Sequence, residues 1–129
     1  MILAISAALN EARLRGVLAF LDTGGPGTVQ VFAGTRPALG APPEAPALVA
    51  ITLALPAGTV AEDVLTLTPT AEALVATTGL ASWARLVNGA GELAFDCDVA
   101  ETGGPGEITL PTLQLYAGGY SRLSAGALG

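Results

Sequence analysis

The sequence predicts a mainly β protein: an antiparallel β-sandwich of jelly-roll type with about eight short strands and one N-terminal α-helix. Only one stretch, residues 4–21, repeats its apolar residues near helical spacing. From residue 28 onward, short apolar runs alternate with turns rich in Gly and Pro. A length of 129 residues suits a single domain. We therefore expect one domain over residues 1–129, with the helix at 4–21 and the sandwich at 28–125.

The expected helix has an apolar face and a clear end. Its apolar positions recur near every third or fourth residue, and Glu11 precedes Arg15 by one turn. The segment Asp22 to Gly27 then stops the helix with three glycines and a proline. Two roles fit this helix: packing on its own sheet, or an arm that docks on a neighbouring molecule. The apolar face consists of Ile5, Leu9, Val17, Leu18 and Leu21.

The remaining segments are expected to be strands and loops. Residues 34–46 contain four prolines and are expected to form a loop. Residues 71–75 could form a helical turn instead of part of a strand, because a short apolar run fits both periods. The expected strands are 28–33, 48–55, 64–68, 73–78, 108–116 and 120–125, together with a hairpin over 80–99.

The hairpin gives the sharpest prediction of burial. Asn88 to Gly91 supplies residues that accept a positive φ at the turn. In the return strand, alternation places Leu93, Phe95, Cys97 and Val99 on the core face. Cys97 should therefore be a buried, unreactive thiol. Glu92, Ala94, Asp96 and Asp98 should lie on the solvent face.

The segment Thr23 to Gly27 recurs as Thr102 to Gly106 with the same five residues, Thr-Gly-Gly-Pro-Gly. Each copy precedes an apolar run that ends in Ala-Gly. A tight turn before a strand requires Gly and Pro, which explains the repeat without further assumptions. An internal duplication is the alternative.

The composition excludes several classes of function. The chain has no histidine and no lysine, so it lacks the commonest general base and metal ligand and the amine of Schiff-base and phosphate chemistry. A net charge of −6 repels nucleic-acid phosphates. The longest uncharged run, 45–61, contains two prolines and is too short to span a bilayer. The apolar N-terminus lacks the basic start of a signal peptide. We expect a soluble, unexported protein that is not an enzyme and binds no nucleic acid or membrane.

No catalytic residue, cofactor or bound metal is expected. The glycine clusters lack the spacing of phosphate-binding loops, and the serines lack a base. Asp96 and Asp98 are either the solvent side of a half-buried strand or a weak Ca²⁺ site. Trp83 and Arg85 lie at strand spacing and could form a cation–π pair or an interface hot spot. With Arg36 in the proline-rich loop, they are the candidate protein contacts; a local structural role is the alternative for each.

Three stretches together carry a resemblance to a known group: Phe20–Ala38, Thr78–Val99 and Gly118–Ala125. They form a pattern of helix, Gly-Pro-Gly turn, strand and hairpin that covers most of the chain. In this pattern the chain resembles small head-associated structural proteins of tailed bacteriophages and prophages, and within that group the capsid decoration, or cement, proteins. No catalytic residue is carried over by this resemblance.

The resemblance implies a β-sandwich on the outer surface of the virion, bound to the major capsid protein and stabilising the head. The chain is only 12% charged, which also suggests self-association into a dimer or other small oligomer. Two alternatives remain open. The first is a structural protein of the tail or the head–tail connector. The second is a carbohydrate- or Ca²⁺-binding β-sandwich module, with Trp83 as a stacking platform.

Overall fold

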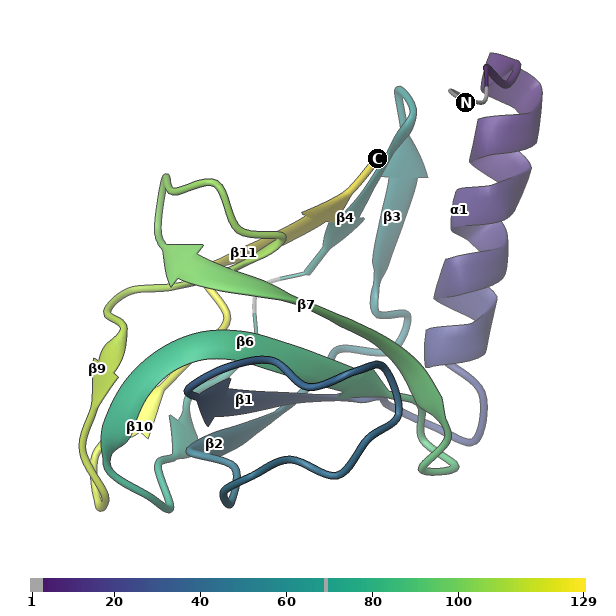
Figure 1. The fold of residues 1–129 in the computed structure, drawn as a ribbon. Helices are drawn as coiled ribbons and strands as arrows, with labels where there is room; N and C mark the ends of the chain where they lie inside the picture. Colours follow the sequence, from purple (N-terminus) through teal and green to yellow (C-terminus); the bar gives the residue numbers. More distant parts are fainter. Residues whose placement is uncertain (1–3, 69) are drawn as a thin grey trace.

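The computed structural model describes residues 4–68 and 70–129. Within them the chain forms one α-helix and eleven strands, which confirms the mainly β class (Figure 1). The elements are α1 (Ala7–Leu21), β1 (Thr28–Ala33), β2 (Val49–Thr52), β3 (Gly58–Ala61), β4 (Val64–Leu67), β5 (Ala73–Leu74), β6 (Gly79–Val87), β7 (Leu93–Glu101), β8 (Ile108–Leu110), β9 (Gln114–Leu115), β10 (Tyr120–Ser121) and β11 (Ala125–Leu128).

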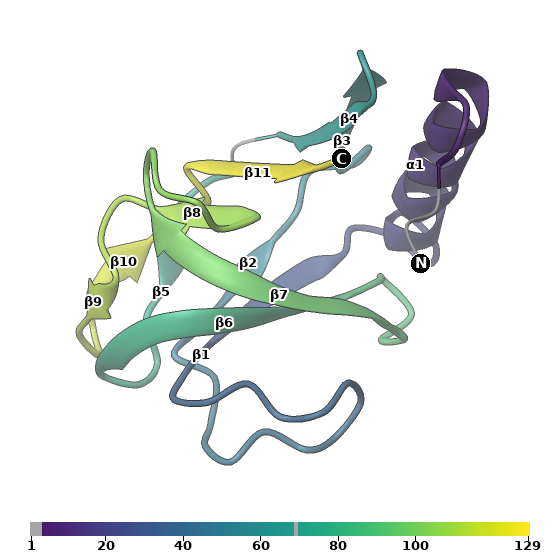
Figure 2. The same cartoon turned by 45° about the horizontal axis from the view of Figure 1, so that its top comes forward.

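The strands build one curled sheet and a small ribbon. Neighbours in the sheet follow the order β2-β1-β6-β7-β8-β11-β4-β3, with β9 paired to β6 beside this path. The ribbon consists of β5 and β10. Figure 2 shows β1, β6 and β7 in one layer and β8, β11 and β4 in the other, with α1 at one end. The core lies between these two layers of the sheet. It includes Val29, Ile51 and Leu86 from the first layer and Leu67 and Ile108 from the second.

The expected strand pattern is confirmed for β1, β4 and the β6–β7 hairpin and needs correction elsewhere. Of the expected strand 48–55, only Val49–Thr52 is a strand, and there are eleven strands in the described residues where about eight were expected. The expected strand 108–116 divides into β8 and β9, because Pro111 between them has no backbone N–H to donate. The expected strand 120–125 also divides, into β10 and β11, and these pair with different partners. Only Ala73–Leu74 of the expected strand 73–78 is a strand, and the alternative helical turn at 71–75 does not form.

Strand β3 was not expected from the sequence, because it is short and begins with a glycine. It pairs with β4 through a tight turn in which Glu62 and Asp63 have φ values of 52° and 63°. Such turns match the twist of a hairpin but usually employ Asn or Gly. A Cβ on Gly58 would collide with the carbonyl oxygen of Thr66, so this close pairing requires glycine.

Helix α1 confirms the expected element, but only part of its apolar face is buried. It begins after the N-cap Ser6, whose side chain accepts a hydrogen bond from the backbone N–H of Leu9. Leu14 and Leu21 are fully buried. Ile5 and Leu9, expected on the packed face, are 39% and 55% exposed. The burial therefore concentrates toward the C-terminal half of the helix. The N-terminal half meets the β3–β4 turn through a polar contact, in which the side-chain amide of Asn10 donates to the carbonyl oxygen of Asp63 at 3.4 Å.

A β-bulge changes the expected faces of β7. Leu86 pairs with Phe95 whereas the next residue, Val87, pairs with Leu93, so Ala94 is an extra residue in β7. The bulge turns Leu93 to the face opposite Phe95, which corrects the strict alternation expected from the sequence. Further along β7, Cys97 and Val99 are buried as expected.

The two Thr-Gly-Gly-Pro-Gly copies make different tight turns. The first ends α1 and lies against the β6–β7 turn, where a Cβ on Gly24 would come within 2.7 Å of the backbone nitrogen of Ala90. The second connects β7 to β8, which are parallel neighbours joined only by residues 102–107. Parallel neighbours usually need a crossover of a dozen or more residues. A Cβ on Gly106 would meet the backbone nitrogen of Ala100 at 2.8 Å, so glycine permits this sharp return.

Candidate contact surfaces

The three candidate contact residues lie on one face of the β1-β6-β7 layer, the face turned away from the core. Loop 34–46 passes in front of this face in Figure 1 and below it in Figure 2. Ser82 anchors the loop by donating a hydrogen bond from its hydroxyl to the carbonyl oxygen of Gly34 at 2.5 Å. The position of this proline-rich loop in front of a sheet face could not be predicted, because a loop has no hydrophobic period.

Trp83 is buried and stacks on Phe32 of β1. Their ring centroids are 4.4 Å apart and the rings are inclined by 17°. The β1–β6 register places the two residues directly opposite each other. Only 2% of Trp83 is exposed, so its ring offers no platform for a sugar. The structure thus places Trp83 in a structural role within this chain.

Arg85 and Asp96 form a buried, two-pronged ion pair across β6 and β7. The guanidinium Nε donates to Oδ1 of Asp96 at 2.8 Å, and Nη2 donates to Oδ2 at 3.1 Å. The hydrogen bond with Asp96 raises the pKa of Arg85, and the guanidinium carbon lies 5.4 Å from the Trp83 ring centroid. The predicted cation–π pair is therefore present.

Asp96 is not the solvent-facing carboxylate expected from the sequence. Its side chain is 4% exposed and that of Arg85 is 11% exposed. A buried carboxylate is tolerated here because both of its oxygens accept hydrogen bonds from Arg85. In the described part of the chain, no group of three or more acidic or Cys side chains is arranged to hold a metal ion.

Arg36 is the one candidate that remains accessible. Its Nη1 lies 3.7 Å from Oδ1 of Asp98, and the two side chains are 42% and 67% exposed. Asp98 therefore has the solvent-facing position that the sequence predicts. Arg36 and Leu39 also line a shallow hollow of about 340 Å³ with Pro37, Phe95 and Asp96.

Exposed apolar side chains gather at two places that the sequence analysis did not identify. The first, which we name the helix end, comprises Phe20, Leu39 and Leu93, with exposures of 38%, 66% and 36%. The second, the tyrosine end, comprises Leu74, Leu80, Tyr116 and Tyr120, with exposures of 59%, 58%, 66% and 66%. Strands β9 and β10 of the tyrosine end lie on the side of the molecule opposite α1 (Figure 1).

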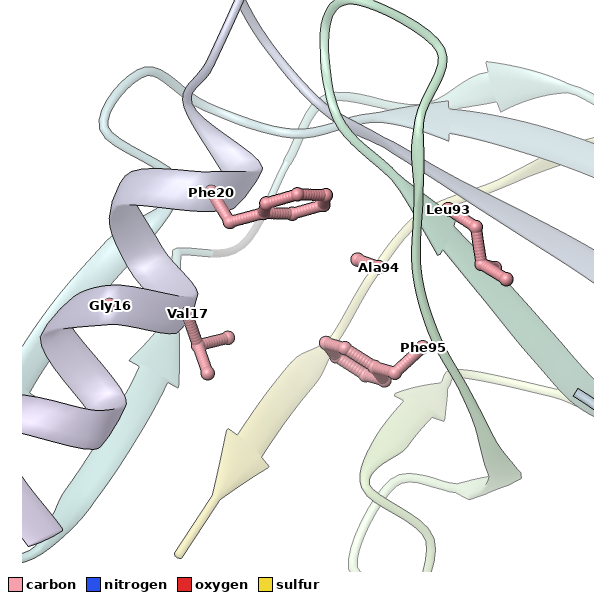
Figure 3. Close-up of a pocket in the computed structure, with 6 residues that line it drawn as sticks. All are labelled: Gly16, Val17, Phe20, Leu93, Ala94 and Phe95. Carbon is pink, nitrogen blue, oxygen red and sulfur yellow. The ribbon is translucent and has the colours of Figure 1, made fainter. Parts of the chain in front are cut away.

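The helix end contains an open apolar groove between α1 and β7. Its volume is about 360 Å³. In Figure 3, Val17 and Phe20 point from the helix toward β7, where Ala94 and the ring of Phe95 face them. Gly16 and Leu93 complete the lining. The bulge at Ala94 shapes this side of the groove, which explains why strand alternation alone could not reveal it.

The tyrosine end has a groove of its own, with a volume of about 390 Å³. Tyr116 and Tyr120 flank it, and Thr112 and Gln114 add polar groups. The sequence Tyr116-Ala-Gly-Gly-Tyr120 carried the only available signal: two aromatic residues on either side of a tight turn. Gly118 has a φ of 89°, which this turn requires.

Cys97 lies in the core behind the ion pairs and is 2% exposed. Burial raises the pKa of its thiol from 9.0 to about 12, with a further contribution from Glu107. The thiol therefore stays protonated and weakly nucleophilic at neutral pH.

In comparisons with known proteins, no family model, no curated protein and no solved structure matches the chain. In residues 4–68 and 70–129, no helix has the length and apolar character needed to cross a bilayer.

Proposed function

We propose that the protein is a bacteriophage capsid decoration protein that binds the major capsid protein on the outside of the head and stabilises the shell. The observation that carries the proposal is the placement of exposed apolar side chains at two opposite ends of the molecule. Contiguous apolar surface marks interaction sites on soluble proteins. The resemblance of the three sequence stretches to decoration proteins supplies the identity of the partner.

Two contact surfaces suit a protein that holds a shell together. If each end contacts a different capsid subunit, the second contact forms within an assembly that the first has already created. Each contact can then be modest while the combined attachment is strong. The curled two-layer sheet supports the proposed jelly-roll-like sandwich as a rigid spacer between the two ends.

The decisive measurement is the copy number of the protein in purified virions, determined by quantitative mass spectrometry. A decoration protein is expected in numbers comparable to the shell subunits, and heads that lack it should dissociate at lower temperature. A handful of copies, or a single ring, would instead support the alternative of a tail or connector protein.

The two ends can be tested separately by binding purified protein to heads that lack it. Tyr116→Ser combined with Tyr120→Ser should weaken binding by up to about 10²-fold, because loss of one contact removes the bridging advantage. Leu39→Ser combined with Phe20→Ser should act similarly at the helix end. Glu62→Gln, an exposed substitution at the β3–β4 turn outside both ends and without loss of apolar surface, is the control. Unchanged binding of both double variants would contradict the bridging arrangement.

The tyrosine end also favours a second candidate, a carbohydrate-binding module. Two exposed tyrosine rings beside Thr112 and Gln114 combine apolar faces with hydrogen-bonding groups, as sugar sites require. This replaces the role first expected of Trp83. Heat release on titration with a glycan panel, abolished by Tyr116→Ser with Tyr120→Ser, would favour this candidate; no heat would remove it.

A further inference from the structure

The groove at the helix end lies beside a strand edge that no other strand covers. On one side, β6 pairs with residues 93–98 of β7. On the other side, β8 pairs only with residues 99–101. Within residues 4–68 and 70–129, the stretch 93–97 therefore has one edge without a strand partner, and the β7–β8 turn closes this edge at its far end, where a Cβ on Gly106 would lie 3.0 Å from the carbonyl oxygen of Asp98. Backbone N–H and C=O groups that point outward from such an edge form a template for an added strand.

The surroundings of this edge define what could be added. Helix α1 lies beyond it, but the two elements leave the open groove lined by Val17, Phe20, Ala94 and Phe95 (Figure 3). An extended segment in this groove would donate to and accept from the strand edge while placing alternate side chains against the apolar lining. A helix could not satisfy the backbone groups of β7, so the edge favours an extended occupant.

The charges beside the edge indicate which kind of segment would bind there. Exposed carboxylates stand at both ends of the free edge, Glu92 at one and Asp98 at the other. Glu92 accepts a hydrogen bond only from the neutral amide of Asn88, at 3.1 Å, among the described side chains. Asp98 has one contact with Arg36, at 3.7 Å. Six positions along the chain separate the two residues, which is roughly 20 Å in a regular strand and less here because of the bulge at Ala94. An occupant with a basic residue near each end would complement both.

A second copy of this chain fits poorly. Two β7 edges paired antiparallel about Phe95 would place Glu92 of each copy opposite Asp98 of the other. Like charges directly opposite each other destabilise strand pairs. The chain also carries a net charge of −6, which opposes close self-pairing along an acidic strand.

We propose that the groove between α1 and the free edge of β7 accepts an extended segment of a partner protein as an added strand, with alternating apolar residues and a basic residue at each end. This deepens the proposed function and rests on it for the source of the segment, a capsid subunit. The strand-addition mode itself follows from the free edge, the groove and the two carboxylates.

The test uses the full chain and a defined probe, the peptide Lys-Val-Thr-Val-Thr-Val-Lys with blocked ends, whose lysines match the spacing of Glu92 and Asp98. We expect amide resonance shifts confined to residues 93–98 and to the groove side of α1, together with slowed hydrogen exchange along that edge. Two control peptides, one with glutamates in place of both lysines and one with proline at the centre, should bind at least about tenfold more weakly.

Variants of the protein test the contribution of the carboxylates and of the apolar lining separately. Glu92→Gln and Asp98→Asn should each weaken the lysine peptide about two- to fivefold at low salt, and less at high salt. Glu72→Gln, an equally exposed carboxylate outside the groove, should leave binding unchanged. Phe20→Ser removes apolar lining on the helix without touching the strand and should also weaken binding.

Three results would overturn the proposal: no binding at millimolar peptide, resonance shifts centred elsewhere, or equal binding of the glutamate peptide. None of them would alter the copy number of the protein in virions, so the proposed function would stand without this docking mode. Conversely, peptide binding at the edge with no protein found in virions would retain the strand-accepting groove and remove the capsid as its source.

Discussion

Two arginine–aspartate pairs on the same face of β7 show how differently one strand can use the same residue types. Arg85 and Asp96 are almost fully buried and share two hydrogen bonds of 2.8 and 3.1 Å. Asp98 lies two residues further along β7 than Asp96 and faces Arg36 of loop 34–46. Both side chains are largely exposed, and Nη1 of Arg36 comes only within 3.7 Å of Oδ1 of Asp98. The two pairs differ in how well neighbouring residues shield them from water. Trp83 lies against the Arg85 guanidinium, and Pro37 and Leu39 of loop 34–46 lie beside Asp96. Asp98 is further toward solvent.

Burial makes an ion pair costly to break. An exposed pair contributes little, because water competes for both charges. A buried pair need not stabilise the fold relative to an apolar pair, but losing one partner leaves the other charge without compensation. The two pairs should therefore respond very differently to equivalent substitutions.

The largest effect is expected from Asp96→Ala. Removal of this carboxylate leaves the Arg85 guanidinium buried without a partner, and the free energy of unfolding should fall by about 3–5 kcal/mol. Urea denaturation followed by circular dichroism measures the change. The double variant Arg85→Met with Asp96→Leu should recover most of the loss, because it removes both charges. A loss below about 1 kcal/mol in the single variant would show that the pair is solvated.

A smaller effect is expected from Arg85→Lys, which retains the charge. Lysine cannot form the two-pronged contact with Asp96 or stack on Trp83, so unfolding free energy should fall by about 1–2 kcal/mol. The matched substitution Arg36→Lys should change stability by less than about 0.5 kcal/mol. Equal effects of the two substitutions in urea denaturation would remove the distinction between the pairs.

Cys97 lies between the two aspartates along β7, but on the opposite face of the strand. The pH dependence of the unfolding free energy shows how well its thiol is shielded from water. Its folded pKa of about 12 exceeds the ordinary value of 9.0, so the stability due to the protonated thiol is complete below pH 9.0. It is lost above that pH, because the unfolded chain releases the proton first. At pH 10 the loss should be about 1.4 kcal/mol.

The control for this prediction is Cys97→Ala, whose unfolding free energy should lack that part of the alkaline decline. The comparison uses the change between neutral pH and pH 10 within each protein, so the cavity left by alanine cancels. Parallel declines in the two proteins would place the thiol in contact with water.

The smallest effect is expected from Asp98→Asn. Loss of this exposed charge should change unfolding free energy by less than about 1 kcal/mol, and added salt should reduce the difference further. Thermal denaturation at two salt concentrations provides the measurement. A larger, salt-independent loss would mean that Asp98 is as well shielded as Asp96.

Local patterns predicted the elements whose residues determine their own conformation. The helix, β1 and the β6–β7 hairpin were all expected near their observed bounds, because periodicity and turn residues act within a few positions along the chain. Cys97 was expected in the core for the same reason. For the candidate contact residues, strand spacing predicted that Trp83 and Arg85 lie close together. No local pattern predicted that Arg36 lies near them.

The mainly β class, the single helix and the alternation that buries Cys97 and Val99 could be predicted, because each depends on the residue pattern along one segment. The burial of Asp96, the turning of Leu93 away from Phe95 and the parallel return of β8 beside β7 depend on contacts between distant segments. Burial depends on which distant segment covers a face. Loop 34–46, the bulge and the second glycine turn act through such long-range contacts, which no local period encodes.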